Sequence, residues 1–309
     1  MLRVRHNLTF RGTVLLSVFL GVCLLAVPLR AQVPGAGNEV DGVLAIRHVE
    51  RLVGFGPRPP GSAGSQKTQD YIIAYLRKLN LKVETQPFLA NTPNGAIGMK
   101  NIVASLPGER EAVILLGSHY DTKPMVNGIF VGANDGGSST GLLLELARVL
   151  SRRKLRYTLQ FVFFDGEEAQ RQWTETDSLY GSRYFVAQLS REAKQGTIKA
   201  MILLDMIGDK DLVLENELSS TSSLMEMVRK SGRELGYSKH LAKAPNEIVD
   251  DHIPFLQVGI PAVDLIDYDY GFNNIYWHTP NDTLDKISPQ SLGIVGAIVL
   301  KTIEKLNKE

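Results

Sequence analysis

Short apolar runs alternate with amphipathic segments along most of the chain. The apolar runs have the length of buried strands, whereas the amphipathic segments repeat apolar residues at the spacing of a helix that packs on one face. Strands, each with its polar continuation, are expected at 82–90, 100–106, 111–121, 157–168, 198–209 and 261–269. Helices are expected at 43–55, 65–79, 141–153, 222–235 and 289–306.

This alternation predicts the fold class. Strands that alternate with helices are typical of a sheet flanked by helices. The composition, 44% hydrophobic and 22% charged, is that of an ordinary globular chain, and no Pro/Ser-rich linker interrupts the interior. We therefore expect residues 42–309 to form a single α/β domain with a central mixed, mostly parallel β-sheet.

The N-terminal segment differs from the rest of the chain. Three arginines precede an uncharged apolar run over residues 13–29, and the small residue Ala31 follows. This pattern is typical of a secretory signal peptide, so we expect residues 1–31 to be cleaved and residues 32–41 to form a flexible leader. An uncleaved membrane anchor is the alternative, because Leu29-Arg30-Ala31 is an imperfect cleavage site. Either way the protein is expected to be exported, to the periplasm or the extracellular space.

Charge and cysteine content narrow the function classes. Without the four arginines of residues 1–31, 30 of the 34 basic residues remain against 33 acidic ones. A nucleic-acid partner would require a basic face, so none is expected. The only cysteine, Cys23, lies in the apolar run. The mature domain would therefore have no disulfide, and contact with a membrane is expected only through an uncleaved N-terminal segment.

Chemically active side chains follow four of the apolar runs. In open α/β sheets, ligands bind outside the carboxyl ends of the strands, so we expect these side chains to meet at one rim. They are His119 and Asp121, Glu167 and Glu168, Asp205, and Asp264.

Asp135 in GANDGG and His278 in YWHT complete a donor set that is typical of a metal site. Imidazole nitrogens and carboxylate oxygens without thiolates suit a catalytic zinc ion. The adjacent glutamates then have a chemical explanation: Glu168 binds the metal, and its neighbour Glu167, with a raised pKa, moves a proton. A helix cap at Asp135 and a turn residue at Asp205 are the alternatives.

At these residues the chain resembles a family of zinc enzymes. GSHYDT, VGANDGGSSTGLLLELAR, FFDGEE, LYGSR, LLDMIG and WHTPNDT are similar to the co-catalytic zinc aminopeptidases and the related glutaminyl-peptide cyclotransferases, over residues 43–303. The resemblance implies that Asp135, Glu168 and His278 bind one zinc ion. His119 and Asp205 match positions that complete a second zinc site in the aminopeptidases.

Three segments resemble the cyclotransferase branch in particular. They are the loop of residues 169–180 with Trp173, the stretch VDDHIPFL of residues 249–256, and Trp277 beside His278. This branch implies a single zinc ion and the conversion of N-terminal glutamine of peptides or proteins to pyroglutamate, with release of ammonia. It also implies roles for five residues: Glu167, Asp205 and Asp250 in catalysis, and Trp173 and Trp277 as walls of the substrate pocket.

Two other functions remain open. A two-zinc aminopeptidase is the main alternative, because His119 and Asp205 are both present. A binding ectodomain without catalysis is the other alternative. Such a protein would be expected to have lost metal ligands, whereas every metal-ligand position of the family pattern is retained here. Asp264 departs from the animal cyclotransferases, which carry a histidine there, so its role is undecided. A monomer that acts on peptide N-termini is expected.

Overall fold

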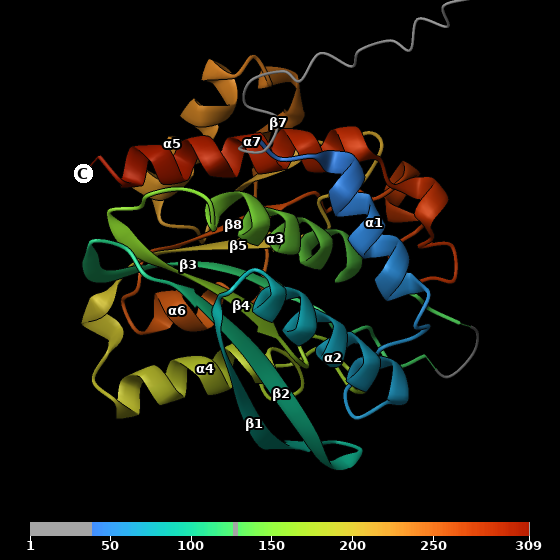
Figure 1. Cartoon of the computed structure of the whole chain (residues 1–309). Coiled ribbons are helices and arrows are strands. Elements are labelled where there is room, and N and C mark those ends of the chain that lie inside the picture. Colours follow the sequence, from blue (N-terminus) through green and yellow to red (C-terminus); the bar gives the residue numbers. More distant parts are fainter. Residues whose placement is uncertain (1–38, 126–128, 309) are drawn as a thin grey trace, which may run out of the picture. The chain divides into compact units, whose positions relative to one another are not determined.

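The computed structural model describes residues 39–125 and 129–308, and its main sheet has six strands (Figure 1). Their order is β1-β2-β4-β3-β5-β8. The pairings β1/β2 and β2/β4 are antiparallel and the other three are parallel, which confirms the expected mixed, mostly parallel sheet. The bounds are β1 Lys82–Thr92, β2 Gly95–Leu106, β3 Arg110–His119, β4 Tyr157–Phe164, β5 Ile198–Asp205 and β8 Ala262–Ile266.

Helices cover both faces of this sheet (Figure 1). One face carries α1 Gly42–Val53, α2 Ala63–Lys78, α3 Gly137–Leu150, α5 Ser222–Glu234 and α7 Pro289–Leu306. The other carries α4 Tyr180–Arg191 and the short α6 Ile253–Gln257. The strands β6 Leu214–Glu217 and β7 Leu241–Asn246 form a second, two-stranded parallel sheet.

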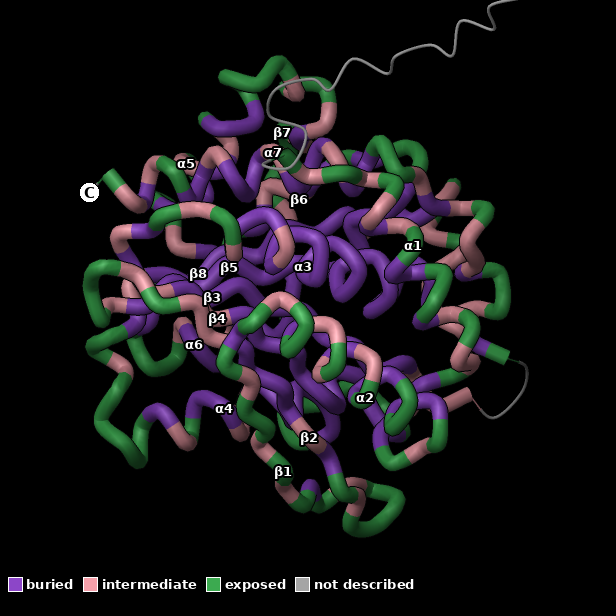
Figure 2. The backbone as a smooth tube through the Cα atoms, viewed as in Figure 1, coloured by how far each residue is buried: buried purple, intermediate pink, exposed green. Residues whose placement is uncertain are grey.

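The middle of the sheet is buried on both sides, as Figure 2 shows for β3 and its neighbours. Side chains of a strand alternate between its faces. In β3, Ile114 and Leu116 pack toward the larger helical layer, and Val113 and Leu115 pack toward α4 and α6. Because both faces are covered, the strand has an unbroken apolar run rather than an alternating pattern.

The structure contains elements that the apolar pattern does not predict: α4, α6, β6 and β7. The last three have only four to six residues, too few for a period to show. Helix α4 begins inside the LYGSR motif, where glycine and serine obscure its buried stripe of Phe185, Val186 and Leu189. The strands β3, β4, β5 and β8 end earlier than the expected ranges, because their polar continuations are loops, whereas β1 and β2 are longer than expected.

The N-terminal predictions fall largely outside the described residues. These include the expected signal peptide, residues 1–31, and residues 32–38 of the expected leader. Asp41, the last residue of that leader, is the N-cap of α1, and its backbone N–H donates to Glu145 Oε1 at 2.8 Å. Within residues 39–125 and 129–308, no helix is both long and apolar enough to cross a membrane.

We expect mild acid to destabilise the fold through His48 on α1. Its imidazole is buried against the Tyr75 ring, and its Nδ1 lies 2.6 Å from the Tyr71 hydroxyl. Burial, and then the charge of Arg148, lowers the pKa of His48 to about 4. The unfolded chain therefore binds this proton more readily than the folded chain. Stability from neutral His48 is complete above the ordinary pKa of 6.5 and is lost as the pH falls toward about 4.

Urea unfolding at pH 7 and pH 5 tests this expectation. Linkage predicts that His48 alone removes about 2 kcal/mol from the free energy of unfolding between these pH values. His48→Gln does not titrate and retains a polar group for the Tyr71 hydroxyl, so it should lose about 2 kcal/mol less. An equal loss in both proteins would contradict the argument.

Candidate active site and metal centre

A pocket of about 360 Å³ lies at the carboxyl ends of the parallel strands. β3 and β5 end in His119 and Asp205, and the two glutamates follow β4, which pairs with β3. The lining contains most of the sequence-predicted site residues. They are Asp135, Glu167, Glu168, Trp173, Asp205, Asp250, Trp277 and His278.

Three of these residues form a compact donor group, although they come from distant parts of the chain. His278 Nε2 lies 3.2 Å from Asp135 Oδ2 and 3.0 Å from Glu168 Oε1. Among the described residues, Asp135 Oδ2 and both carboxylate oxygens of Glu168 are buried without a hydrogen bond of suitable geometry. Buried carboxylate oxygens need a partner. Zinc bonds of about 2.0–2.2 Å at tetrahedral angles place donor atoms about 3.3–3.6 Å apart. The measured separations of 3.2 and 3.0 Å are close to this range, so the group fits a metal ion.

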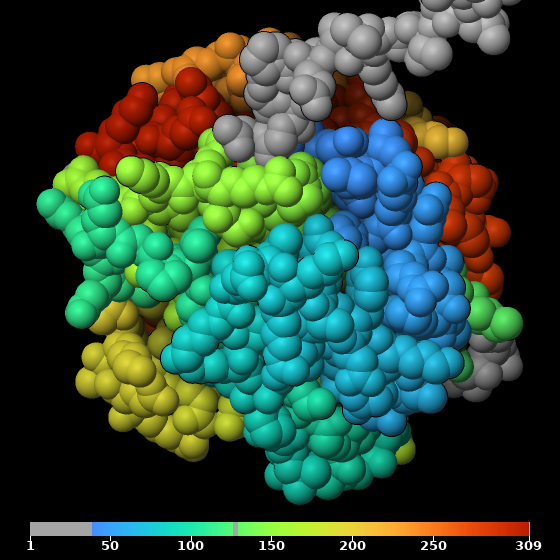
Figure 3. All heavy atoms as spheres, in the orientation of Figure 1, coloured from blue at the N-terminus to red at the C-terminus, as the bar shows by residue number. Residues whose placement is uncertain are grey.

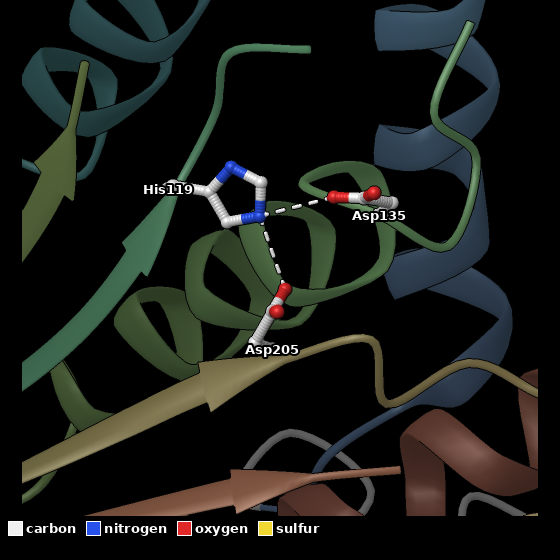
Figure 4. A group of neighbouring side chains, drawn as sticks. All are labelled: His119, Asp135 and Asp205. Atoms are coloured by element: carbon white, nitrogen blue, oxygen red, sulfur yellow. Dashed lines mark hydrogen bonds and ion pairs between the residues drawn. The ribbon is translucent and has the colours of Figure 1, made fainter. Parts of the chain in front are cut away.

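His119, Asp135 and Asp205 form a second, overlapping group (Figure 4). His119 Nε2 lies 3.0 Å from Asp205 Oδ1 and 3.3 Å from Asp135 Oδ1. Asp135 thus directs one carboxylate oxygen toward His119 and the other toward His278. The described residues therefore offer two donor groups that share Asp135, and each has its donor atoms within 4.8 Å of one another.

Two residues that sequence reasoning did not identify hold the loop of Asp135. The carboxylate of Asp282 accepts the backbone N–H groups of Asn134 at 2.7 Å and Asp135 at 3.0 Å. The fully buried guanidinium of Arg58 donates to the carbonyl oxygens of residues 131–132 at 2.5 and 2.9 Å. These bonds satisfy loop backbone groups that burial removes from water, so Asp135 has a defined position. Asp282 lies in WHTPNDT, but composition alone does not distinguish it from a surface turn residue.

Asp121 holds the adjacent glutamates. Its Oδ1 accepts the Glu167 N–H at 3.1 Å, and its Oδ2 accepts the Glu168 N–H at 3.3 Å. Gly166 supports the turn after β4 with a φ of +72°, which favours glycine. The two side chains then diverge: Glu168 contacts His278, whereas Glu167 Oε2 lies 3.8 Å from His119 Nδ1.

Burial raises the pKa of two pocket carboxyls, Glu167 and Asp250. It raises the pKa of Glu167 well above the usual range; His119 opposes this shift, and Glu168 and Asp250 add to it. Burial, and then the charge of Asp205, raises the pKa of Asp250 to about 7. Carboxyl groups that retain a proton near neutral pH are suited to proton transfer.

Aromatic rings surround the donor group of Asp135, Glu168 and His278. Trp277 stacks on His278 with ring centroids 4.0 Å apart and an interplanar angle of 22°, and Phe130 meets the imidazole edge-on at 5.9 Å. Trp277 therefore both lines the pocket and orients His278. Trp173, 38% exposed, forms another part of the wall.

Asp264 does not lie at the rim, so that expectation is wrong. In β8 it pairs with Leu203 of β5, whereas Asp205 pairs with Ile266, two residues further along. Its carboxylate is buried beneath the pocket, and its Oδ2 lies 3.9 Å from Nδ1 of the fully buried His252. The pairing register between β8 and β5 places Asp264 two residues before the end of the strand. The apolar run of a single strand does not reveal this register, so the sequence could not predict how far Asp264 lies below the rim.

With this geometry in place, comparisons with known proteins identify the family. The family model "Peptidase family M28" matches residues 101–303. The chain belongs to peptidase family M28. It is 34% identical over 265 residues to a glutaminyl-peptide cyclotransferase-like protein of Mus musculus, covering 76% of this chain and 68% of that protein.

Solved structures of family relatives agree with the fold. A glutaminyl cyclase from an Acidobacteriales bacterium is similar with a TM-score of 0.84 and 38% identity, covering 87% of this chain and 96% of that one. A Zn-dependent exopeptidase from Parabacteroides distasonis is similar with a TM-score of 0.78 and 29% identity, covering 86% and 99%. These matches confirm the resemblance to the cyclotransferases and the α/β architecture with a mixed sheet flanked by helices.

Proposed function

We propose that the protein is a zinc-dependent glutaminyl-peptide cyclotransferase that converts N-terminal glutamine of peptides or proteins to pyroglutamate and releases ammonia. The observation that carries this proposal is the buried carboxyl of Glu167, which lies in a tryptophan-lined pocket beside the donor group of Asp135, Glu168 and His278. The family relationships support it, because the chain is 34% identical to the glutaminyl-peptide cyclotransferase-like protein of Mus musculus and 38% identical to the glutaminyl cyclase from an Acidobacteriales bacterium.

One zinc ion is proposed, held by Asp135, Glu168 and His278. When bound there, it supplies a Lewis acid that polarises the side-chain amide carbonyl of the substrate glutamine. In this arrangement His119 and Asp205 remain a hydrogen-bonded pair at 3.0 Å and orient the other oxygen of Asp135.

Glu167 is proposed as the proton carrier. The substrate's own α-amine attacks its side-chain amide carbon, so one C–N bond forms as the other breaks. Glu167 accepts a proton from the α-amine and returns one to the departing nitrogen, which leaves as ammonia. A raised pKa favours both halves of this transfer, and Asp205 and Asp250 are proposed to assist it through their shared acidic environment.

Trp173 and Trp277 are proposed to shape the substrate. Cyclisation requires the glutamine side chain to fold back on its own amine. Two indole walls restrict it to such near-attack shapes and exclude water from the reaction.

Product analysis tests the proposed function directly. The purified protein is incubated with glutaminyl dipeptides and, separately, with aminoacyl arylamides, while ammonia and free arylamine are measured. Ammonia together with a pyroglutamyl product is expected. Arylamine without ammonia would instead support a two-zinc aminopeptidase, the function favoured by the second donor group of His119, Asp135 and Asp205. Zinc per chain, measured by mass spectrometry, is expected to be about one for the cyclase and about two for the peptidase.

Export is also proposed, on the basis of residues 1–31. We propose that this segment directs the protein to the periplasm or the extracellular space, where it acts as a monomer on peptide N-termini. Cell fractionation with an antibody against the catalytic domain, combined with N-terminal sequencing of the mature protein, tests both the location and cleavage near Ala31.

Trp173→Ala should weaken substrate binding more than catalysis. Loss of a large aromatic contact in the pocket is expected to raise KM for glutaminyl peptides by about tenfold, with kcat and zinc content nearly unchanged. Trp173→Phe is the matched control and should retain most of the affinity. An unchanged KM for the alanine variant would make Trp173 a packing residue.

A further inference from the structure

The middle of the loop that carries Trp173 is exposed. Between β4 and α4, residues 171–176 are all exposed, and the chain becomes buried again only at Asp177. An exposed loop does not hold an indole over a pocket without tethers, because ordering it costs conformational entropy. Two sets of hydrogen bonds supply such tethers.

The first tether is the carboxylate of Asp177, which is 3% exposed. It accepts the backbone N–H groups of Gln170 at 2.8 Å, Arg171 at 2.9 Å and Gln172 at 3.0 Å, and the hydroxyl of Tyr180 at 2.8 Å. The first three bonds fix the three residues immediately before Trp173, and the fourth holds the carboxylate against the first residue of α4.

The second tether comes from the tip of the β1–β2 hairpin, more than seventy residues earlier in the chain. Asn94 Nδ2 donates to the carbonyl oxygen of Gln170 at 3.1 Å, and Arg171 Nε donates to Asn94 Oδ1 at 2.7 Å. The tip is itself held by Thr92, whose hydroxyl donates to the Gly95 carbonyl at 2.7 Å. The hairpin extends beyond the rest of the sheet and stands out at the lower edge of the surface in Figure 3.

We propose that Asn94 and Asp177 are positioning residues that set substrate affinity by holding Trp173 over the pocket. The kinetic part of this inference rests on the proposed cyclotransferase function. Neither side chain lines the pocket, so each acts through the loop. Loss of either tether lets the indole leave its place, which weakens substrate binding while the metal donors and Glu167 remain in position.

Asn94→Ala is the main test, because Asn94 is exposed and its loss should not prevent folding. KM for glutaminyl peptides is expected to rise about three- to tenfold, consistent with the loss of two hydrogen bonds, and kcat to change by less than about twofold. Asn94→Asp retains the acceptor for Arg171 and should restore part of the affinity. Asn91→Ala is the matched control: Asn91 is an exposed asparagine of the same hairpin, and no hydrogen bond from its side chain occurs within the described part of the chain.

A double-mutant cycle distinguishes action through Trp173 from a general structural effect. In the Trp173→Ala background, Asn94→Ala should no longer change KM, because the wall that it positions is gone. An undiminished effect in that background, or equal effects on kcat and KM in the single variant, would overturn the proposal. Asp177→Ala should show the same pattern as Asn94→Ala with a larger change; if Asp177→Ala does not fold, Asn94→Ala alone decides.

Limited trypsin digestion gives a readout that does not depend on activity. Cleavage after Arg171, identified by mass spectrometry, requires the loop to open, and removal of Asn94 is expected to accelerate it about five- to tenfold relative to wild type and Asn91→Ala. Unchanged cleavage would show that Asn94 is not a tether. If wild type releases no ammonia but the cleavage rate rises, the proposed function fails while the tether stands.

Discussion

Glu167→Gln is expected to lower kcat by about 10²–10⁴-fold, the range typical of removing a general acid or base, while zinc content stays at the wild-type level. The structure separates the two adjacent glutamates: Glu168 contacts the metal-donor nitrogen of His278, whereas Glu167 contacts His119 at 3.8 Å. The amide has the shape of the carboxyl but cannot carry the proton. Ammonia release, zinc content and KM of the purified variant provide the measurement.

Glu168→Gln is the matched control, because the substituted residue is adjacent and the chemical change is the same. It should lose zinc as well as activity, since it removes a charged donor from the group of Asp135 and His278. Zinc loss in Glu167→Gln together with zinc retention in Glu168→Gln would mean that the two glutamates have the opposite roles. The melting temperature of Glu167→Gln should not fall, because the substitution removes a buried carboxyl whose pKa burial raises.

His278→Ala is expected to abolish both zinc binding and cyclisation. The imidazole is the only nitrogen donor of its group and lies 3.0–3.2 Å from the two carboxylates. Without it, two buried carboxylates face each other across the site. Zinc affinity should fall by more than the roughly 10–100-fold typical of losing a residue that merely orients a ligand. Zinc content after dialysis and ammonia release are measured.

His240→Ala is the control for the loss of a histidine, since this side chain lies outside the pocket and interacts with the carbonyl of Leu212 at 2.8 Å. It should retain zinc and activity. If His278→Ala also retained zinc and His119→Ala lost it, the metal would belong to the group of His119, Asp135 and Asp205, and the one-zinc proposal would be wrong.

Much of the fold was predictable because its elements have long, regular patterns. The amphipathic stripe of α7 reflects the period of 3.6 that a helix imposes, and the unbroken apolar run of β3 reflects a strand that is buried on both faces. Elements with too few residues for a period, such as β6 and α6, were not predictable. Chain order also does not reveal the strand order β4-β3-β5-β8, which brings the polar ends of the sheet together.

The candidate site divides in the same way. Residue types at the strand ends and the resemblance to the zinc enzymes predicted Asp135, Glu168 and His278 as a donor group, and the structure brings these three residues together. The resemblance also predicted Trp173 as a pocket wall, and Trp173 lines the pocket. The sequence did not reveal that Arg58, Asp282 and Asn94 hold the loops of that site. Their partners are backbone groups or residues far away in the chain, and such pairings leave no local pattern.

The sequence by itself determined the fold class, the chemical identity of the donor set and the family. Tertiary structure alone decided which oxygen of Asp135 faces which histidine, that Asp121 holds the backbone of the adjacent glutamates, and that Asp264 lies beneath the rim rather than on it. The physical reason is the distance along the chain over which each effect acts. Periodicity and side-chain chemistry act within one segment, whereas strand register, burial and hydrogen bonds between loops exist only after distant segments pack together.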